Sequence, residues 1–175
     1  MPGSRRDDAE FTEFVSQQSD RLYRSAYLLT TSPHAAEDLL QTTLAKIFAG
    51  WRRLRTTDDP VAYSHRILLN AFLSERRLRR SSELPVGDLP DRHAAGTATP
   101  SADLADRVTL MAALAELAPL DRAVIVLRYW HDLSITTTAA DLHLTESAVK
   151  SRTNRALHRL RDLLADDIDI PRRTS

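Results

Sequence analysis

The stretch from Leu133 to Leu160, LSITTTAADLHLTESAVKSRTNRALHRL, contains two short helical patterns separated by a turn. Ser134 is a suitable N-cap for a first helix that buries Ala139 and Leu142. A turn follows at His143-Leu144, and the apolar spacing of a second helix begins directly after it. We therefore predict two helices joined by a tight turn, an arrangement that many DNA-binding domains share.

The second helix of this stretch has one apolar face and one basic face. Thr145 is its predicted N-cap, and its inner face consists of Val149, Ala156, Leu157 and Leu160. Its outer face presents Lys150, Ser151, Arg152 and Arg155. In a helix-turn-helix, such a helix enters the major groove, where an arginine can bond two acceptors on guanine or hold a phosphate. The alternative is a solvated face on a bundle helix that binds no DNA.

The composition places this stretch in a small helical protein. The chain has 175 residues, of which 42% are hydrophobic and only four are glycine, and this favours helix over sheet. Cysteine is absent, which excludes a disulfide scaffold, a thiolate zinc site and a cysteine nucleophile. The N-terminus lacks the apolar core of a signal peptide, and no segment has the length and apolarity of a membrane helix, so we expect a cytoplasmic protein.

The formal net charge is zero, but the charges are unevenly distributed. Acidic residues gather near both ends of the chain, whereas basic residues gather in two blocks, Arg52 to Arg80 and Lys150 to Arg161. Two separate basic faces predict two contacts with one polyanion.

The first half of the chain predicts three helices. The first spans Phe11 to Leu29, and the second begins after the N-cap Ser32 and runs to about Trp51. The expected inward residues of the second helix are Leu40, Leu44, Ile47, Phe48 and Trp51. A polar connection, Arg52 to Asp59, precedes a third helix that Asp59 caps and that ends in a basic run.

The second half begins with a segment rich in proline, glycine and small polar residues, which we interpret as a flexible linker. A helical stripe follows at Leu104, Val108, Met111, Leu114 and Leu117. Asp121 to Trp130 is then expected to form one strongly apolar helix. We predict an all-α protein of two small helical domains, with an N-terminal tail at 1–8, domains at 9–80 and 104–166, a linker at 81–103 and a C-terminal tail at 167–175.

The third predicted helix is a second candidate DNA-binding site. Ala62 to Arg80 has a polar face that includes Arg66, Asn70 and Ser74, and it ends in more arginines than the helix dipole requires. A groove for single-stranded DNA would combine such a basic surface with aromatic rings for base stacking. Tyr63 and Phe72 lie nearby, but either could equally be a core residue, and we expect this for Phe72.

Five segments together resemble the extracytoplasmic-function class of bacterial sigma factors, in particular the actinobacterial SigE-like subgroup. They are AYLLT (26–30), AEDLLQTTLAKIFAGW (36–51), PVAYSHRILLNAFLSERRLRR (60–80), LAPLDRAVIVLRYWHDLS (117–134) and SAVKSRTNRAL (147–157). The order and spacing of these segments, with a linker between them, carry the resemblance.

The resemblance implies three binding sites and no cofactor or metal. Contact with core RNA polymerase, at the clamp helices of its largest subunit, is implied for Asp38, Gln41, Thr42 and Ala45; a further contact is implied with the flap region. Contact with the melted minus-ten promoter element is implied for Arg52, Arg55, Arg66, Asn70, Ser74, Arg76 and Arg77. Contact with the minus-thirty-five element is implied for Thr145, Glu146, Ser147, Lys150, Ser151, Arg152 and Arg155. The partners would be core polymerase and promoter DNA, with an anti-sigma factor as a further candidate.

The sequence departs from the pattern of this class at three positions. Thr137 stands where relatives usually have glutamate, His143 where they have glycine, and Ala148 where they have threonine. Glycine tolerates a left-handed backbone in the turn, so His143 is expected to be modestly strained. We expect these changes to alter base preference or to weaken the contact with duplex DNA somewhat, rather than to change the fold.

The sequence leaves three alternative functions to be weighed. A helix-turn-helix regulator with an N-terminal sensing domain would bind duplex DNA without polymerase. An enzyme is disfavoured because the six histidines are scattered and neither a metal-binding spacing nor a phosphate-binding glycine loop is present. A helical adaptor or anti-sigma protein would leave both basic faces without a purpose.

Overall fold

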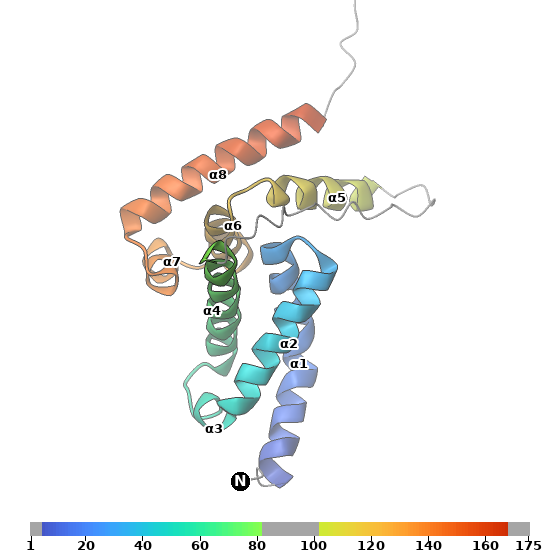
Figure 1. Cartoon of the computed structure of the whole chain (residues 1–175), viewed down its shortest axis with the longest axis vertical. Coiled ribbons are helices and arrows are strands. Elements are labelled where there is room, and N and C mark those ends of the chain that lie inside the picture. Colours follow the sequence, from blue (N-terminus) through green and yellow to red (C-terminus); the bar gives the residue numbers. More distant parts are fainter. Residues whose placement is uncertain (1–4, 82–101, 168–175) are drawn as a thin grey trace, which may run out of the picture. The chain divides into compact units, whose positions relative to one another are not determined.

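A computed structural model describes residues 5–81 and 102–167, and within these ranges every long element is a helix and no strand is found (Figure 1). The chain divides into two compact units, Met1–Asp88 and Leu89–Ser175. The predicted all-α architecture with two small units is therefore confirmed. The predicted linker and C-terminal tail lie almost entirely outside the described residues.

Unit 1 contains α1 (Arg5–Thr30), α2 (Pro33–Ala49), α3 (Trp51–Leu54) and α4 (Pro60–Ser81). Helix α2 packs along α1, and α4 packs against both (Figure 1). Their shared core includes Leu22, Leu29, Leu39, Ile47, Leu54, Leu68 and Phe72. Helix α1 begins at Arg5, inside the segment expected to be a tail.

The predicted N-caps of this unit are confirmed. The Ser32 hydroxyl accepts a hydrogen bond from the backbone N–H of Ala35 at 3.4 Å, and Asp59 accepts one from Ala62 at 2.9 Å. Each cap satisfies a backbone donor that has no partner within the helix. Thr31, in the turn before α2, has a left-handed backbone with φ of 60°.

Two expectations for α2 and its continuation are wrong. Phe48 was expected to point inward but is 57% exposed, because the buried row of α2 runs through Leu39, Thr43 and Ile47 instead. Thr43 tolerates burial because its hydroxyl donates to the carbonyl of Leu39 at 2.7 Å. The segment expected to be a polar connection from Arg52 begins inside helix α3, which buries Leu54.

Unit 2 contains α5 (Ala102–Ala115), α6 (Pro119–Ile125), the π-helical turn η1 (Val126–Trp130), α7 (Ile135–Leu142) and α8 (Glu146–Asp167). Helix α8 packs on α5, α6 and α7. The core includes Leu114, Leu117, Val124, Leu127, Leu142, Val149, Ala156 and Leu160.

The expected single helix from Asp121 to Trp130 is instead α6 followed by the wider turn η1. Val108, which belongs to the predicted apolar stripe, is exposed. The buried residues of α5 lie toward its C-terminal end, at Ala113 and Leu114, and Val108 lies closer to the start of the helix.

Candidate nucleic-acid interface

Helices α7 and α8 form the predicted helix-turn-helix. The Ser134 hydroxyl accepts from the backbone N–H of Thr137 at 3.0 Å, and the Thr145 hydroxyl accepts from that of Ala148 at 3.1 Å, so both helix starts are capped as expected. The turn is closed by a hydrogen bond from Leu144 N–H to Ala139 O at 2.8 Å. His143 takes a left-handed conformation with φ of 54°, as expected for a position where glycine is favoured.

The first turns of α8 present a polar surface to solvent. Its exposed residues that were predicted to read DNA are Thr145, Glu146, Ser147, Lys150 and Ser151. On the opposite side, Val149 and Ala156 are fully buried, and this burial fixes the rotation of the helix about its axis. The Thr136 hydroxyl donates to the Glu146 carboxylate at 2.6 Å and ties α7 to α8.

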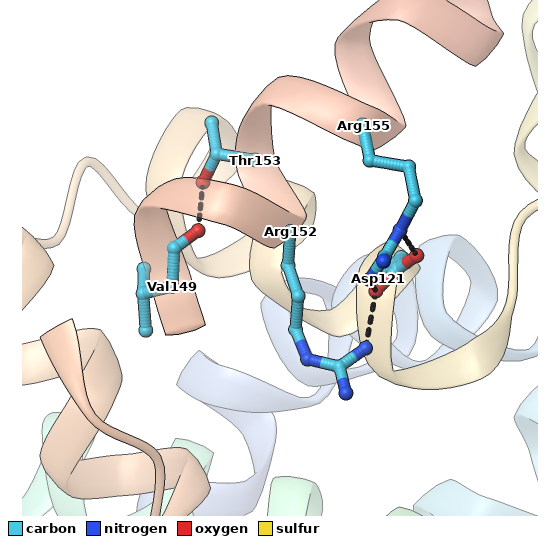
Figure 2. Close-up of polar contacts among 5 residues, drawn as sticks. All are labelled: Asp121, Val149, Arg152, Thr153 and Arg155. Atoms are coloured by element: carbon cyan, nitrogen blue, oxygen red, sulfur yellow. Dashed lines mark hydrogen bonds and ion pairs between the residues drawn. The ribbon is translucent and has the colours of Figure 1, made fainter. Parts of the chain in front are cut away.

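Arg152 and Arg155, the other two predicted DNA-reading residues, both bind the carboxylate of Asp121 on α6 (Figure 2). Arg152 donates from Nη1 to Oδ1 at 2.6 Å. Arg155 donates from Nε to Oδ2 at 3.0 Å and from Nη2 to Oδ1 at 3.1 Å, which is a bidentate pair. We call these three residues the Asp121 cluster.

The electrostatics of the Asp121 cluster favour the charged carboxylate of Asp121. Burial of Asp121, which is 6% exposed, is the largest influence on its pKa and acts to raise it. Hydrogen bonds from Arg155 and Arg152, together with their charges, outweigh burial and hold the pKa of Asp121 below its ordinary value. The same contacts raise the pKa of Arg155. Asp121 and Arg155 are therefore charged at neutral pH.

Sequence reasoning missed Asp121 as part of this site. Its signal was a lone carboxylate in the first turn of a largely apolar helix, where negative charge is favoured. That position explains the residue without any partner. Its arginine partners lie 31 and 34 residues further along the chain, and only packing of α6 on α8 brings them together.

The candidate minus-ten residues of α4 only partly share one surface. Arg66, Asn70, Ser74 and Arg77 follow helical spacing and are all exposed, so they form one stripe along α4. Arg76 lies beside this stripe, half-buried, with its guanidinium 6.0 Å from the ring centre of Phe72. The ring of Phe72 is itself buried in the core, as expected, and is closed to base stacking.

Arg52 and Arg55 lie apart from this stripe, against the start of α1. Arg52 Nε is 3.5 Å from Asp7 Oδ2, and Arg55 Nη2 is 3.5 Å from Asp7 Oδ1. Arg55 Nη1 donates to Glu10 Oε2 at 3.1 Å. We call these four residues the Asp7 cluster, and it places acidic partners on two of the arginines that the resemblance assigned to DNA.

A separate face of α2 carries the four candidate polymerase-binding residues. Asp38, Gln41, Thr42 and Ala45 are all exposed and recur at helical spacing. The same face continues to Phe48, whose ring is exposed although it packs edge-on against Phe11 with ring centres 5.0 Å apart. The sequence pattern placed Phe48 in the core and so missed an apolar residue on this face.

Comparison with known proteins identifies the family of this chain. The Sigma-70 region 2 model matches residues 14–82, and the Sigma-70 region 4 model matches residues 113–162. The chain is 39% identical over 165 residues to the RNA polymerase sigma-E factor of Streptomyces coelicolor, covering 91% of this chain and 89% of that protein. Over 159 residues it is 35% identical to the ECF RNA polymerase sigma factor SigE of Mycolicibacterium smegmatis, covering 87% of this chain and 61% of that protein.

The chain belongs to the ECF sigma factors. A solved relative agrees: the sigma factor RpoE of Bartonella quintana, crystallised with the anti-sigma factor NepR, superposes with a TM-score of 0.69 at 30% identity. The alignment covers 91% of this chain and 98% of that structure. As a sigma factor the protein binds core RNA polymerase and promoter DNA and directs transcription initiation. The reading as a polymerase-independent helix-turn-helix regulator is not favoured.

Within residues 5–81 and 102–167, His, Asp and Glu side chains form no group of three or more suited to holding a metal ion. In the same ranges no helix combines the length and apolarity that crossing a membrane requires.

Proposed function

We propose that α8 reads the minus-thirty-five element through Thr145, Glu146, Ser147, Lys150, Ser151, Arg152 and Arg155. The observation that carries this proposal is the orientation of α8: its apolar face is buried while Lys150 and Ser151 stand exposed on its first turns. A helix held in this way can present its N-terminal residues to the edges of bases in a major groove. The three departures at Thr137, His143 and Ala148 flank this surface and are expected to alter promoter preference.

The stripe on α4 is proposed to hold the melted minus-ten element. Arg66 and Arg77 would neutralise backbone phosphates, while Asn70 and Ser74 between them offer hydrogen bonds to an unstacked base. Arg76 would add charge from the side. Arg52 and Arg55 belong to this site only if DNA displaces the carboxylates of Asp7 and Glu10 from them.

The exposed face of α2 is proposed to bind core polymerase at the clamp helices of its largest subunit. Asp38 and Gln41 supply polar contacts, and the exposed ring of Phe48 adds an apolar anchor of the kind that often dominates binding energy at interfaces. Thr42 and Ala45 complete the face. A second contact, between unit 2 and the flap region, is proposed for the same assembly.

Control by an anti-sigma factor is also proposed, because the Bartonella relative was solved with one. An anti-sigma factor that covers the α2 face would compete directly with polymerase. We further propose that the protein works in the cytoplasm, carries no catalytic activity or cofactor, and has its two working domains at 9–80 and 104–166. The region 2 and region 4 matches lie close to these limits, at 14–82 and 113–162.

In vitro transcription with core polymerase on a genomic template library tests the function as a whole. Addition of the protein should create new start sites that share upstream and downstream elements. Lys150→Glu should reduce transcription from these sites without weakening polymerase binding, whereas Arg161→Glu, an exposed reversal of charge further along α8, should leave transcription unchanged. Equal effects of the two variants would contradict the assignment of α8.

The polymerase face requires its own experiment. The double variant Asp38→Ala/Gln41→Ala should weaken association with core polymerase in a pull-down. Addition of Phe48→Ala to this double variant should weaken the association further. Glu37→Ala, on the same helix but outside the assigned set, is the matched control. Unchanged association in the double variant would remove the assignment of α2.

A further inference from the structure

We infer that Asp121 is a positioning residue for promoter reading: it holds the guanidinium groups of Arg152 and Arg155 in the orientation in which they meet the minus-thirty-five duplex. The inference rests on the proposed role of α8. Asp121 would touch no DNA itself. It would act by fixing how two arginines present their remaining donors.

The two arginines are placed for such control by their position on α8. Residues 152 and 155 are three apart and therefore lie on the same side of the helix. That side forms the margin between the buried face of α8 and solvent: the Arg152 side chain is 29% exposed and the Arg155 side chain 59%. Each guanidinium thus reaches the carboxylate of Asp121 (Figure 2), while part of each side chain remains exposed to solvent.

The donors used by Asp121 determine which donors remain. An arginine carries five N–H donors in a planar fork. Arg155 binds Asp121 through Nε and Nη2, the side of the fork nearest the chain. The two donors at the far end, one on Nη1 and one on Nη2, point away from that bond and match two acceptors on a guanine edge. The bidentate bond along one edge of the planar guanidinium therefore orients the free donors along its other edge.

Orientation matters more than charge for base reading. A freely rotating arginine is attracted to any phosphate, whereas a base edge requires two donors in a fixed plane. Asp121 is suited to fix this plane because it is buried on α6 and receives three hydrogen bonds from the two arginines. It also cancels one of two positive charges, which limits sequence-independent attraction to DNA.

The test compares holoenzymes on two probes. One is a promoter fragment selected by the wild-type holoenzyme, and the other is the same fragment with its upstream element scrambled. The variants are Asp121→Asn, which removes the charge, and Asp121→Glu, which keeps the charge but moves the carboxylate by one methylene. Asp162→Asn, an exposed change of the same charge on α8, is the control. Thermal melting by circular dichroism reports whether each variant folds.

Both Asp121 variants should lose about tenfold or more in discrimination between the probes, the size of one bidentate base contact. Binding of the scrambled probe should not weaken, and Asp162→Asn should discriminate like the wild type. Combining Asp121→Asn with Arg155→Ala should cost little more than Arg155→Ala alone, since the carboxylate acts through the arginine.

Several results would overturn the inference. Full discrimination by Asp121→Asn would show that the arginines need no positioning, and a loss in Asp121→Asn that Asp121→Glu restores would show that only charge matters. Equal weakening on both probes, or failure of both variants to fold, would make Asp121 a structural anchor. By contrast, a wild-type holoenzyme that does not distinguish the probes would refute the proposed role of α8 itself, and the inference with it.

Discussion

Each unit pairs two arginines with carboxylates from another helix, but the two clusters differ in geometry. In the Asp7 cluster of unit 1, two of the three contacts are 3.5 Å long, and the Arg52 side chain is 72% exposed. In the Asp121 cluster of unit 2, all contacts lie between 2.6 and 3.1 Å and converge on one buried carboxylate. Asp7 is itself only 13% exposed, so the clusters differ mainly in contact length and in the exposure of their arginines. The same residue types therefore make long ion pairs in one unit and short, converging hydrogen bonds in the other.

The difference indicates different consequences for DNA binding. Long ion pairs on exposed arginines are screened by salt and contribute little stability, so we expect a phosphate to replace the carboxylates of Asp7 and Glu10 on Arg52 and Arg55 at small cost. The carboxylate of Asp121 is shielded from solvent and bound by both arginines, so exchange would leave a buried charge without partners. We therefore expect Arg52 and Arg55 to exchange their carboxylate partners for DNA phosphates. Arg152 and Arg155 should stay bound to Asp121. Four measurements compare the two units, two of them through these clusters.

The largest effect is expected from Asp121→Ala, which should lower the free energy of unfolding of unit 2 by about 2 kcal/mol, since hydrogen bonds to charged groups are lost. The two tryptophans report the units separately, because Trp51 lies in unit 1 and Trp130 in unit 2. Urea denaturation followed through Trp130 in a Trp51→Phe background measures the loss. Asp162→Ala should change stability by less than about 0.5 kcal/mol; similar losses for both would show that burial of Asp121 is unimportant.

A smaller and opposite effect is expected from His143→Gly, which should stabilise unit 2 by about 1 kcal/mol. Glycine removes the steric cost of a Cβ atom at φ of 54°. The gain is reduced by the extra conformational entropy that glycine loses on folding. Thr31→Gly should act in the same direction on unit 1, where φ is 60°. Thermal melting should compare His143→Gly with His143→Ala, which keeps a Cβ atom and therefore the backbone strain. The difference between the two variants measures the cost of that strain. A gain in both histidine variants would point to the imidazole instead.

The double variant Asp7→Ala/Glu10→Ala should cost unit 1 less than about 1 kcal/mol, because two of the three ion pairs are 3.5 Å long and their arginines are exposed. The loss should shrink further in 1 M salt, where charges are screened within about 3 Å. Urea denaturation followed through Trp51 in a Trp130→Phe background, at low and high salt, gives both values. A loss as large as that of Asp121→Ala, unaffected by salt, would erase the contrast between the clusters.

The smallest difference is expected in mild acid. Burial lowers the pKa of His65 below its ordinary 6.5, and Arg21 acts in the same direction, against the Val61 carbonyl and Asp59. The unfolded chain therefore binds this proton first, and unit 1 should lose stability as the pH falls below 6.5.

The corresponding loss in unit 2 follows the lowered pKa of Asp121 and should begin only below its ordinary 3.8. Urea midpoints at pH 7.5 and 5 should therefore shift more for unit 1 than for unit 2, and His65→Gln should reduce the shift in unit 1. An unchanged shift in His65→Gln would assign it to other groups.

Local signals in the sequence predicted most of the helices and their starts. Ser32, Asp59, Ser134 and Thr145 are followed by helical apolar spacing, and each accepts the expected hydrogen bond. The left-handed turn at His143 was also predictable, because its cause lies within a few residues. Apolar spacing alone was less reliable: it placed Phe48 inward and Val108 in an apolar stripe, yet both side chains are exposed. A spacing shows that a helix has an apolar side but not which residues the neighbouring helices cover.

The sequence by itself determined the helical fold class, the division into two units, the helix-turn-helix and its capped recognition helix. These features depend on interactions between residues close in the chain and on the pattern of apolar residues along each helix. Only the tertiary structure decided that Arg152 and Arg155 share the carboxylate of Asp121, and that Arg52 and Arg55 face Asp7 and Glu10. Charges separated by more than thirty residues meet only where helices pack, and no local rule contains the rotation that brings them together.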